Sequence, residues 1–267
     1  MKVRDIAETI EAFAPLPLQE DYDNAGLQVG RRDMNVSAVL LCLDVTPEVL
    51  DEACRRQCNM IVSHHPLIFR GLKSLTGDDP VQQVAIEAIR RDVAIYSAHT
   101  NLDSTWDGVS HEMGHILGLR NLRVLQAAGS QLDSDPEQPR YGLGVVGETS
   151  PTPKLEFLRK VKEKFGVKAL RYSAQSPKLV VKKVALCGGS GASLVKDAVK
   201  AGADILITGD VKYHDFTSYA QAIILADIGH YESECCSASI FSRILRERFP
   251  DLVVYFSESQ KNPVGFL

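Results

Sequence analysis

Eight strand-like apolar runs alternate with helical patterns along the chain, and this alternation constrains the fold more than any other feature. Amphipathic stretches such as TPEVLDEACRRQ and TPKLEFLRKVKEKFG lie between the runs. Strands that are apolar almost throughout are typical of sheets covered by helices on both faces, so the pattern predicts an α/β fold. The runs cover residues 36–45, 59–64, 93–100, 141–148, 182–189, 203–210, 222–230 and 252–259.

The length of 267 residues allows two such sheets with separate cores. The polar stretch AGSQLDSDPEQPR at 128–140 is the best candidate for a boundary or an insertion point. The same strand–helix rhythm runs on both sides of it. We therefore expect two related α/β lobes: residues 1–127, completed by 235–267, and residues 128–234.

Composition narrows the class of protein. An apolar fraction of 45% and a formal net charge of −4 are ordinary for a globular protein and give no support to nucleic-acid binding. No apolar run is long enough to span a membrane. The first residues, MKVRDIAETIEAFAP, predict an amphipathic helix rather than a signal peptide, so we expect a cytoplasmic protein without membrane attachment.

Reactive side chains follow four of the predicted strands. Because ligands of α/β sheets bind at the carboxyl ends of strands, these four positions are the candidate site. Five of the seven histidines lie there, together with carboxylates. The four groups are Ser63-His64-His65, the segment from His99 to Asp103, Asp210 followed by Lys212-Tyr213-His214, and the segment from His230 to Glu234.

Histidine and carboxylate together suit zinc, manganese, iron or nickel. His230 and Glu234 are four residues apart, so a helix that begins there turns both toward one point. Adjacent side chains on a strand diverge, so His64 and His65 would each serve a different ion of a pair. Two ions, one ion and a purely structural hydrogen-bonded cluster all remain open at this point.

A competing motif lies at His111-Glu112-x-x-His115, which matches the zinc-peptidase pattern HExxH. The longer form of that pattern needs a third histidine where this chain has Asn121, and it needs a methionine further along, which the chain lacks. We expect instead an amphipathic helix that packs Met113 and its apolar neighbours, with both histidines near the surface.

Two other features are weaker candidates. Cys54 and Cys58, four apart on a predicted helix, have no partner pair at zinc-finger spacing. The glycine-rich stretch LCGGSGASL at 186–194 could bind an anion through backbone N–H groups, but it lacks the P-loop ending, so a tight strand-to-helix turn is favoured. Cys42 and Cys187 lie within apolar runs and are expected to be core residues.

Several motifs in register resemble one family. EDYDNAGLQVG (20–30), SHHPLIF (63–69), SAHTNLDSTWDGVS (97–110), TGDVKYHDF (208–216), GHYESE (229–234) and NPVGF (262–266) together resemble the GTP cyclohydrolase I type 2 homolog family, also called the Nif-three-like family. The resemblance covers essentially the whole chain. The chain resembles the short form of the family, which lacks the domain that longer members insert near the middle. Tyr22 stands where many members carry tryptophan.

The resemblance implies two α/β lobes with a dinuclear metal site between them, in a toroidal homohexamer. Two divalent ions per subunit (zinc, iron, manganese or nickel) are implied, with Glu234 bridging them and His99 as the candidate catalytic residue. On matching positions the implied metal ligands are His64, His65, Asp103, His230 and Glu234.

These observations favour a metal-dependent hydrolase that acts on a small nucleotide-like substrate, with GTP cyclohydrolase-type activity as one form. Lys212, Tyr213 or His214 would then position the substrate. The alternative is a metal-dependent binding or regulatory scaffold without turnover. Substrate-dependent turnover that disappears with Asp103→Ala would separate the two.

Overall fold

The structure is a computed structural model that describes residues 1–129 and 141–267. Most of the boundary expected at 128–140 therefore lies outside the described residues. The described chain forms two compact units, each built on its own sheet. Unit 1 comprises Met1–Leu102 and Ser237–Pro263, and unit 2 comprises Asp103–Cys236 and Val264–Leu267.

Unit 1 contains a five-stranded sheet in the order β1-β4-β3-β2-β11. Its four neighbours β4, β3, β2 and β11 are parallel, and β1 pairs with β4 antiparallel at the edge. The central strands are buried along their whole length, as the apolar runs predicted. The strands are β1 (Gly26–Val29), β2 (Ala38–Cys42), β3 (Met60–Ser63), β4 (Ala94–Ser97) and β11 (Val253–Phe256).

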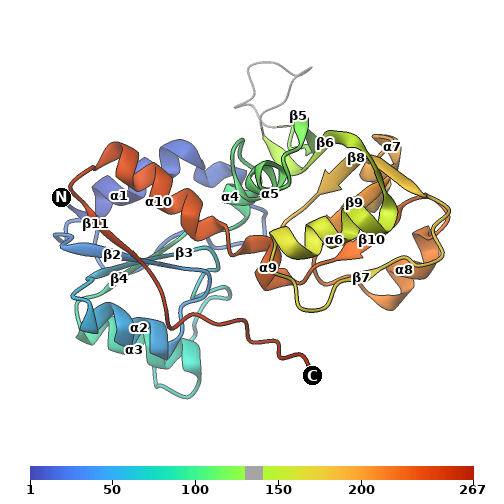
Figure 1. Ribbon diagram of the computed structural model, residues 1–267. Helices are drawn as coiled ribbons and strands as arrows, with labels where there is room; N and C mark the ends of the chain where they lie inside the picture. The colour runs from blue at the N-terminus through green and yellow to red at the C-terminus, as the bar shows by residue number, and fades with distance from the viewer. Residues whose placement is uncertain (130–140) are drawn as a thin grey trace. The chain divides into compact units, whose positions relative to one another are not determined.

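Helices cover both faces of this sheet, α1 and α10 on one side and α2 and α3 on the other (Figure 1). Local sequence sets where α2 and α3 begin: the side chains of Thr46 and Asp79 cap their first turns, and a proline follows each cap. The helices of unit 1 are α1 (Val3–Phe13), the short η1 (Leu16–Leu18), α2 (Pro47–Arg55), α3 (Pro80–Arg90) and α10 (Ser237–Arg248). A short helix, α4 (Thr100–Asp103), contains the boundary with unit 2.

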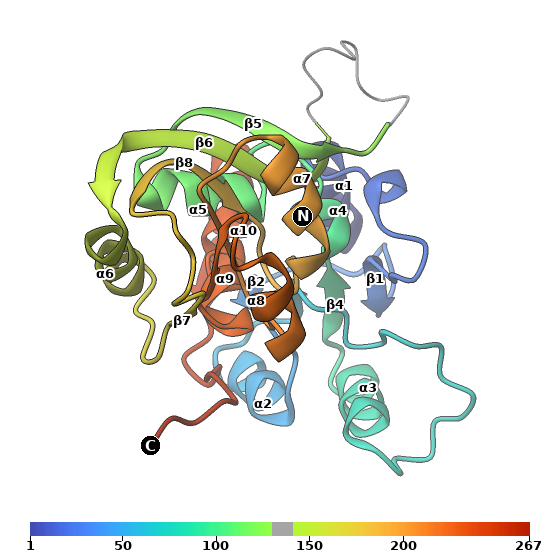
Figure 2. The same cartoon turned by 90° about the vertical axis from the view of Figure 1, so that its right-hand side faces the viewer.

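Unit 2 contains a six-stranded sheet in the order β5-β6-β8-β9-β10-β7. Strands β8, β9 and β10 are parallel, whereas the long pair β5 and β6 is antiparallel (Figure 2). The strands are β5 (Arg120–Ala127), β6 (Gly142–Pro153), β7 (Arg171–Tyr172), β8 (Val180–Leu186), β9 (Ile205–Thr208) and β10 (Ile224–Asp227).

Apolar side chains again cover both faces. Alternate residues of β8, β9 and β10 pack against α5 and α6 on one face, and the residues between them pack against α7 and α8 on the other. The helices of unit 2 are α5 (Val109–Leu117), α6 (Lys154–Lys164), η2 (Ala192–Leu194), α7 (Val195–Lys200), α8 (Tyr213–Tyr219) and α9 (His230–Glu234).

The α/β fold class is confirmed, and all eight predicted runs contain strands. The bounds of the units differ from the sequence-based lobes over residues 103–127, which were assigned to the first lobe. In the structure, β5 pairs with β6 and α5 packs on the same sheet, so this stretch belongs to unit 2. Strands β1, β5 and β7 were not predicted, because they are short or carry polar residues within the strand, whereas the edge strand β11 has the apolar sequence VVYF and was predicted.

Candidate metal-binding site

Three histidines meet at one edge of the sheet of unit 1. Because β3 and β4 are parallel neighbours with Ser63 opposite Ser97, the residues that follow them lie close together. The ring centroids of His64, His65 and His99 are 5.2 to 5.4 Å apart. One nitrogen of each ring lies within 4.8 Å of a nitrogen of the other two, a spacing at which the three could hold a metal ion.

Each of these rings is oriented through Nδ1. Nδ1 of the fully buried His64 donates to the Ala98 carbonyl at 2.9 Å, and Nδ1 of His65 contacts Oδ1 of Asp44 at 2.7 Å. These partners only accept hydrogen bonds, so each ring carries a proton on Nδ1. This is the arrangement in which proteins present histidine to metals.

The hydrogen-bond partner of His99 is a carboxylate that also accepts hydrogen bonds from Thr100. Nδ1 of His99 lies 2.8 Å from Oδ1 of Asp23, a carboxylate that is fully buried. Burial alone would raise the pKa of Asp23, but hydrogen bonds from His99 and Thr100 outweigh it and hold the pKa well below its usual range. Asp23 is therefore ionised at neutral pH and fixes the orientation of the His99 ring.

Unit 2 presents carboxylates and one histidine. His230 and Glu234 span the single turn of α9, which begins three residues after β10, and Nε2 of His230 lies 2.9 Å from Oε2 of Glu234. A carboxylate oxygen of Asp103 lies within 4.8 Å of one of Glu234. Nδ1 of His230 contacts Oδ2 of Asp210 at 2.7 Å. The hydrogen bond with Glu234, reinforced by Asp210, raises the pKa of His230 to about 9 despite the burial of its ring.

The glycine-rich turn makes room for Glu234. A Cβ at Gly189 would lie 2.1 Å from Oε1 of Glu234, and Gly189 has a φ of +58°. The N–H of Gly189 donates to Oγ of Ser233, and that of Gly191 donates to Oγ1 of Thr208. Because protein oxygens already accept from these two N–H groups, the structure favours the tight turn over an anion cradle.

Two residues of the site, Asp23 and Asp44, were not identified from the sequence, and Asp210 was placed among the strand-end groups without a specific role. Asp44 stands two residues after the end of β2, as Asp210 does after β9, so the same signal could have found it. Asp210 also has a φ of +53°, a conformation uncommon outside glycine and asparagine. Asp23 has no such signal, since it lies 76 residues before its partner in an irregular loop.

The HExxH segment forms the helix α5, as expected, but its two histidines do not behave alike. His111 is buried and its ring packs 4.2 Å from Trp106, so the expectation that both lie near the surface was wrong for His111. Burial lowers the pKa of His111 to about 4. His115 is exposed. Within residues 1–129 and 141–267, neither histidine joins a group of three metal-ligating side chains.

The cysteine alternatives are also resolved. Cys58 lies beyond the end of α2, so it does not share a helical face with Cys54. Neither belongs to a metal-ligating group within the part of the chain that the structure describes. Cys42 and Cys187 are buried, which confirms them as core residues.

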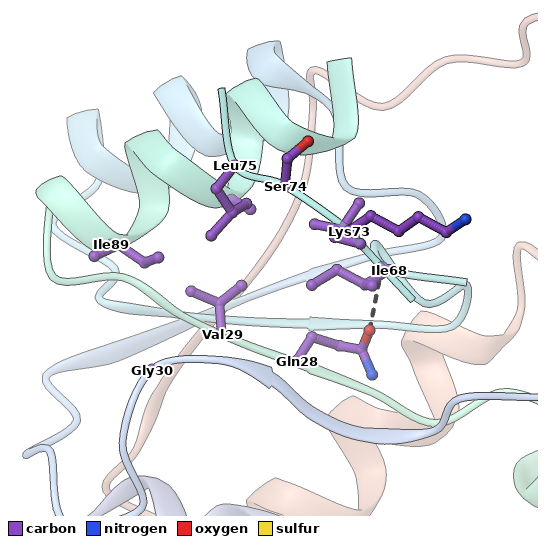
Figure 3. A pocket seen from close by; sticks show the side chains of 10 residues that line it. Gln28, Val29, Gly30, Ile68, Lys73, Ser74, Leu75 and Ile89 are labelled. Atoms are coloured by element: carbon purple, nitrogen blue, oxygen red, sulfur yellow. Dashed lines mark hydrogen bonds between the residues drawn. The ribbon is translucent and has the colours of Figure 1, made fainter. Parts of the chain in front are cut away.

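Two hollows lie apart from the histidines. One in unit 1, of about 520 Å³, has mostly apolar walls with Lys73 at its edge, and no predicted ligand lines it (Figure 3). One in unit 2, of about 440 Å³, is lined by Lys212, Asp210 and Ser190 among others. Lys212, Tyr213 and His214, any of which was predicted to position a substrate, are exposed at the start of α8. Among the described residues, none of the helices combines the length and apolarity that crossing a bilayer requires.

The sequence matches known proteins over nearly its whole length. A family model described as Duf34/NIF3 (NGG1p interacting factor 3) matches residues 1–263. A protein of Clostridium perfringens named GTP cyclohydrolase 1 type 2 homolog is 38% identical, and the match covers 100% of both chains. A protein of the same name from Clostridium acetobutylicum is 37% identical over 92% of this chain and 90% of its own.

Solved structures show the same fold. The crystal structure of Staphylococcus aureus protein SA1388 superposes with a TM-score of 0.89 at 27% sequence identity. The superposition covers 100% of this chain and 99% of the other.

Proposed function

The chain belongs to the Duf34/NIF3 family, and from that premise we propose that it binds two divalent metal ions and acts as a metal-dependent hydrolase on a small nucleotide-like substrate. One observation carries the proposal. Four of the five histidines at the strand ends have Nδ1 held by an acceptor, which makes Nε2 the nitrogen that would bind a metal in His64, His65 and His230. In His230, the ion would replace the proton that Nε2 shares with Glu234. The proposed ligands are His64, His65, Asp103, His230 and Glu234.

The donor chemistry fits this proposal. Imidazole nitrogens with carboxylate oxygens suit zinc, iron, manganese and nickel, whereas magnesium and calcium prefer oxygen alone. His64 and His65 are adjacent in sequence, so each would bind a different ion, and Glu234 would be shared between the two. We include Asp103 among the proposed ligands because it is the last residue of the short helix α4, and α4 begins directly after His99.

Bound ions of this kind polarise the substrate and lower the pKa of a water ligand toward ~7. His99 would hold and transfer a proton at Nε2, because Asp23 keeps its other nitrogen protonated. Asp23 would be a positioning residue that fixes the tautomer and orientation of His99. A guanine nucleotide is the substrate class suggested by the names of the relatives, and we carry it to this chain only as part of the proposal.

The family resemblance also supports a toroidal homohexamer located in the cytoplasm. Light scattering on the purified protein measures the number of subunits. A stable monomer would overturn the hexamer without affecting the metal proposal, because the proposed ligands all come from one chain.

The deciding experiment is metal content per chain, measured by mass spectrometry on untagged protein purified without chelators. We expect about two transition-metal ions in the unaltered protein and in Glu163→Ala, which changes an exposed glutamate of α6. Glu234→Ala should lose both ions. A full complement of metal in Glu234→Ala would overturn the ligand assignment.

The second part of the experiment separates catalysis from binding. His99→Ala should keep both ions and lower kcat for GTP hydrolysis by about 100-fold, the usual contribution of general acid–base catalysis. Metal-dependent GTP binding without product, in protein that holds its ions, would favour the binding or scaffold function instead.

A further inference from the structure

Two exposed aromatic side chains lie beside the histidines of unit 1. Tyr22 is 64% exposed and Phe69 is 41% exposed, although large aromatic rings usually bury most of their surface. Their ring centroids are 6.3 Å apart and their planes are inclined by 56°. The Phe69 ring also lies 6.1 Å from the His99 ring, nearly perpendicular to it. The aromatic pair and His99 therefore form one continuous surface.

The loops that hold the two rings are tied to each other. The side chain of Asn24 donates to the Ile68 carbonyl at 2.6 Å. The Ile68 N–H donates to the side chain of Gln28 at 3.1 Å, the bond drawn as a dashed line in Figure 3. Ile68 immediately precedes Phe69, so these bonds fix the backbone next to one ring.

The other ring is fixed through its neighbour in sequence. Asp23 follows Tyr22 and accepts hydrogen bonds from His99 and from the backbone and side chain of Thr100. The contact that orients His99 thus also fixes the backbone next to Tyr22. A surface ordered before binding loses little conformational entropy when a ligand arrives.

We propose that Tyr22 and Phe69 bind the planar heteroaromatic ring of the substrate, which stacks on them next to His99. The role of His99 in this inference rests on the proposed function. Exposed aromatic faces bind flat rings through stacking, which tolerates different ring types because every base has a π-face. Because the pair is angled, a ring stacked on Phe69 meets Tyr22 at a tilt, an arrangement that aromatic pairs favour.

The inference predicts which part of a ligand each residue recognises. A nucleotide should lose affinity when either ring is removed, whereas a phosphate chain without a base should not. The aromatic pair therefore selects for ligands with a flat ring, and specificity among bases would have to come from other contacts.

Calorimetric titration tests the inference with three probes: GTP, ATP and inorganic triphosphate. We expect Tyr22→Ala and Phe69→Ala each to weaken binding of both nucleotides about tenfold or more and to leave triphosphate binding within about twofold. Tyr22→Trp should restore the affinity. Tyr255→Ala is the matched control, since Tyr255 is an exposed aromatic residue of unit 1 on β11, with 37% exposure.

Three results would overturn the inference: unchanged nucleotide affinity in both variants, an equal loss for triphosphate, or no binding of either nucleotide in the millimolar range. Metal content measured on the same samples separates this outcome from failure of the proposed function. If the protein holds no metal but the ring preference remains, the proposed function fails and the aromatic site stands. If two ions are present and the ring preference is absent, the aromatic site alone fails.

Discussion

The two units present different kinds of side chain at the carboxyl ends of their strands. Each places side chains at the carboxyl ends of parallel strands, but unit 1 presents the imidazoles of His64, His65 and His99, whereas unit 2 pairs one imidazole with the carboxylates of Asp103 and Glu234. Imidazoles supply neutral nitrogen donors, and carboxylates supply the negative charge that a divalent ion requires. The proposed ligands of unit 1 would therefore be nitrogen donors, and those of unit 2 would also supply negative charge.

The way each unit holds its histidines differs as well. His64 is fully buried and bonded to a backbone carbonyl, so its position is set by the strand itself. His230 is 37% exposed on its side chain and lies between two carboxylates, Asp210 and Glu234. Unit 1 thus combines one ring held by the backbone with two rings that are each held by one carboxylate, Asp44 for His65 and Asp23 for His99, whereas the ring in unit 2 lies between two carboxylates.

The largest effect is expected in the glycine-rich turn that makes room for the Glu234 carboxylate. Gly189→Ala should lower the free energy of unfolding by about 3 kcal/mol and should remove bound metal, because the new Cβ would collide with Oε1 of Glu234. Gly166→Ala is the control. Gly166 has a similar φ of +64°, but a Cβ there meets nothing within 4 Å. The free energy of unfolding should therefore fall by about 1 kcal/mol, and no metal should be lost. Denaturant unfolding and metal analysis measure both. Equal effects in the two variants would mean that Glu234 does not need this space.

The carboxylates behind the histidines give the next largest effect. Asp44→Asn in unit 1 and Asp210→Asn in unit 2 should each weaken metal binding by about 10- to 100-fold, because the ring loses its carboxylate partner. The loss should be greater for Asp210, since His230 is held by charge. Asp92→Asn is the control, with a similar left-handed backbone at φ +52°. Competition with a chelating dye measures the affinity for metal. An unchanged metal affinity in both variants would mean that neither carboxylate supports metal binding through its histidine.

A third effect is confined to unit 1, which the chain completes with residues 237–263. The buried carboxylate of Glu52 accepts hydrogen bonds from Ser257, Glu258 and Ser259. Glu52→Gln should therefore cost about 1–3 kcal/mol of unfolding free energy. Hydrogen exchange should increase in β2 and β11 but not in β8 or β9. Faster exchange spread evenly over both units would contradict this.

The same carboxylate gives the pH dependence a definite sign. Burial would raise the pKa of Glu52, but hydrogen bonds from Ser257, Glu258 and Ser259 lower it to about 2 from an ordinary value of 4.5. A lowered pKa in the folded state means that the stabilisation is complete above about pH 4.5 and is lost as the pH falls toward 2. The difference in stability between the unaltered protein and Glu52→Gln should shrink over this range.

The smallest effect is expected in the HExxH segment. His115→Ala changes an exposed side chain whose nearest acidic atom, Oδ1 of Asp107, is 3.6 Å away. The free energy of unfolding should change by less than about 0.5 kcal/mol, and metal content should stay the same. Loss of one ion from this variant would revive the peptidase-like site that the structure disfavours.

Sequence patterns predicted most of the fold because they report how each segment is buried. Strands β2, β3, β9 and β10 are buried along their whole length, so their apolar runs were unambiguous. Strands β1, β5 and β7 were missed because they are short or interrupted by polar residues, whereas the edge strand β11 is apolar in sequence and was predicted. The assignment of residues 103–127 differed for a related reason, since pairing of β5 with β6 is not visible in β5 alone.

The sequence by itself determined the α/β class, the family and the positions of reactive side chains at strand ends, because these follow from local composition and from motifs in register. Only the tertiary structure decided which acceptor orients which histidine. Asp23 lies 76 residues from His99, Asp44 lies 21 from His65, and Asp210 lies 20 from His230. Such pairs form when neighbouring strands and loops meet, and no local pattern encodes them. The tertiary structure likewise decided that His111 is buried and that Gly189 faces Glu234, because burial at a single position depends on what packs against it.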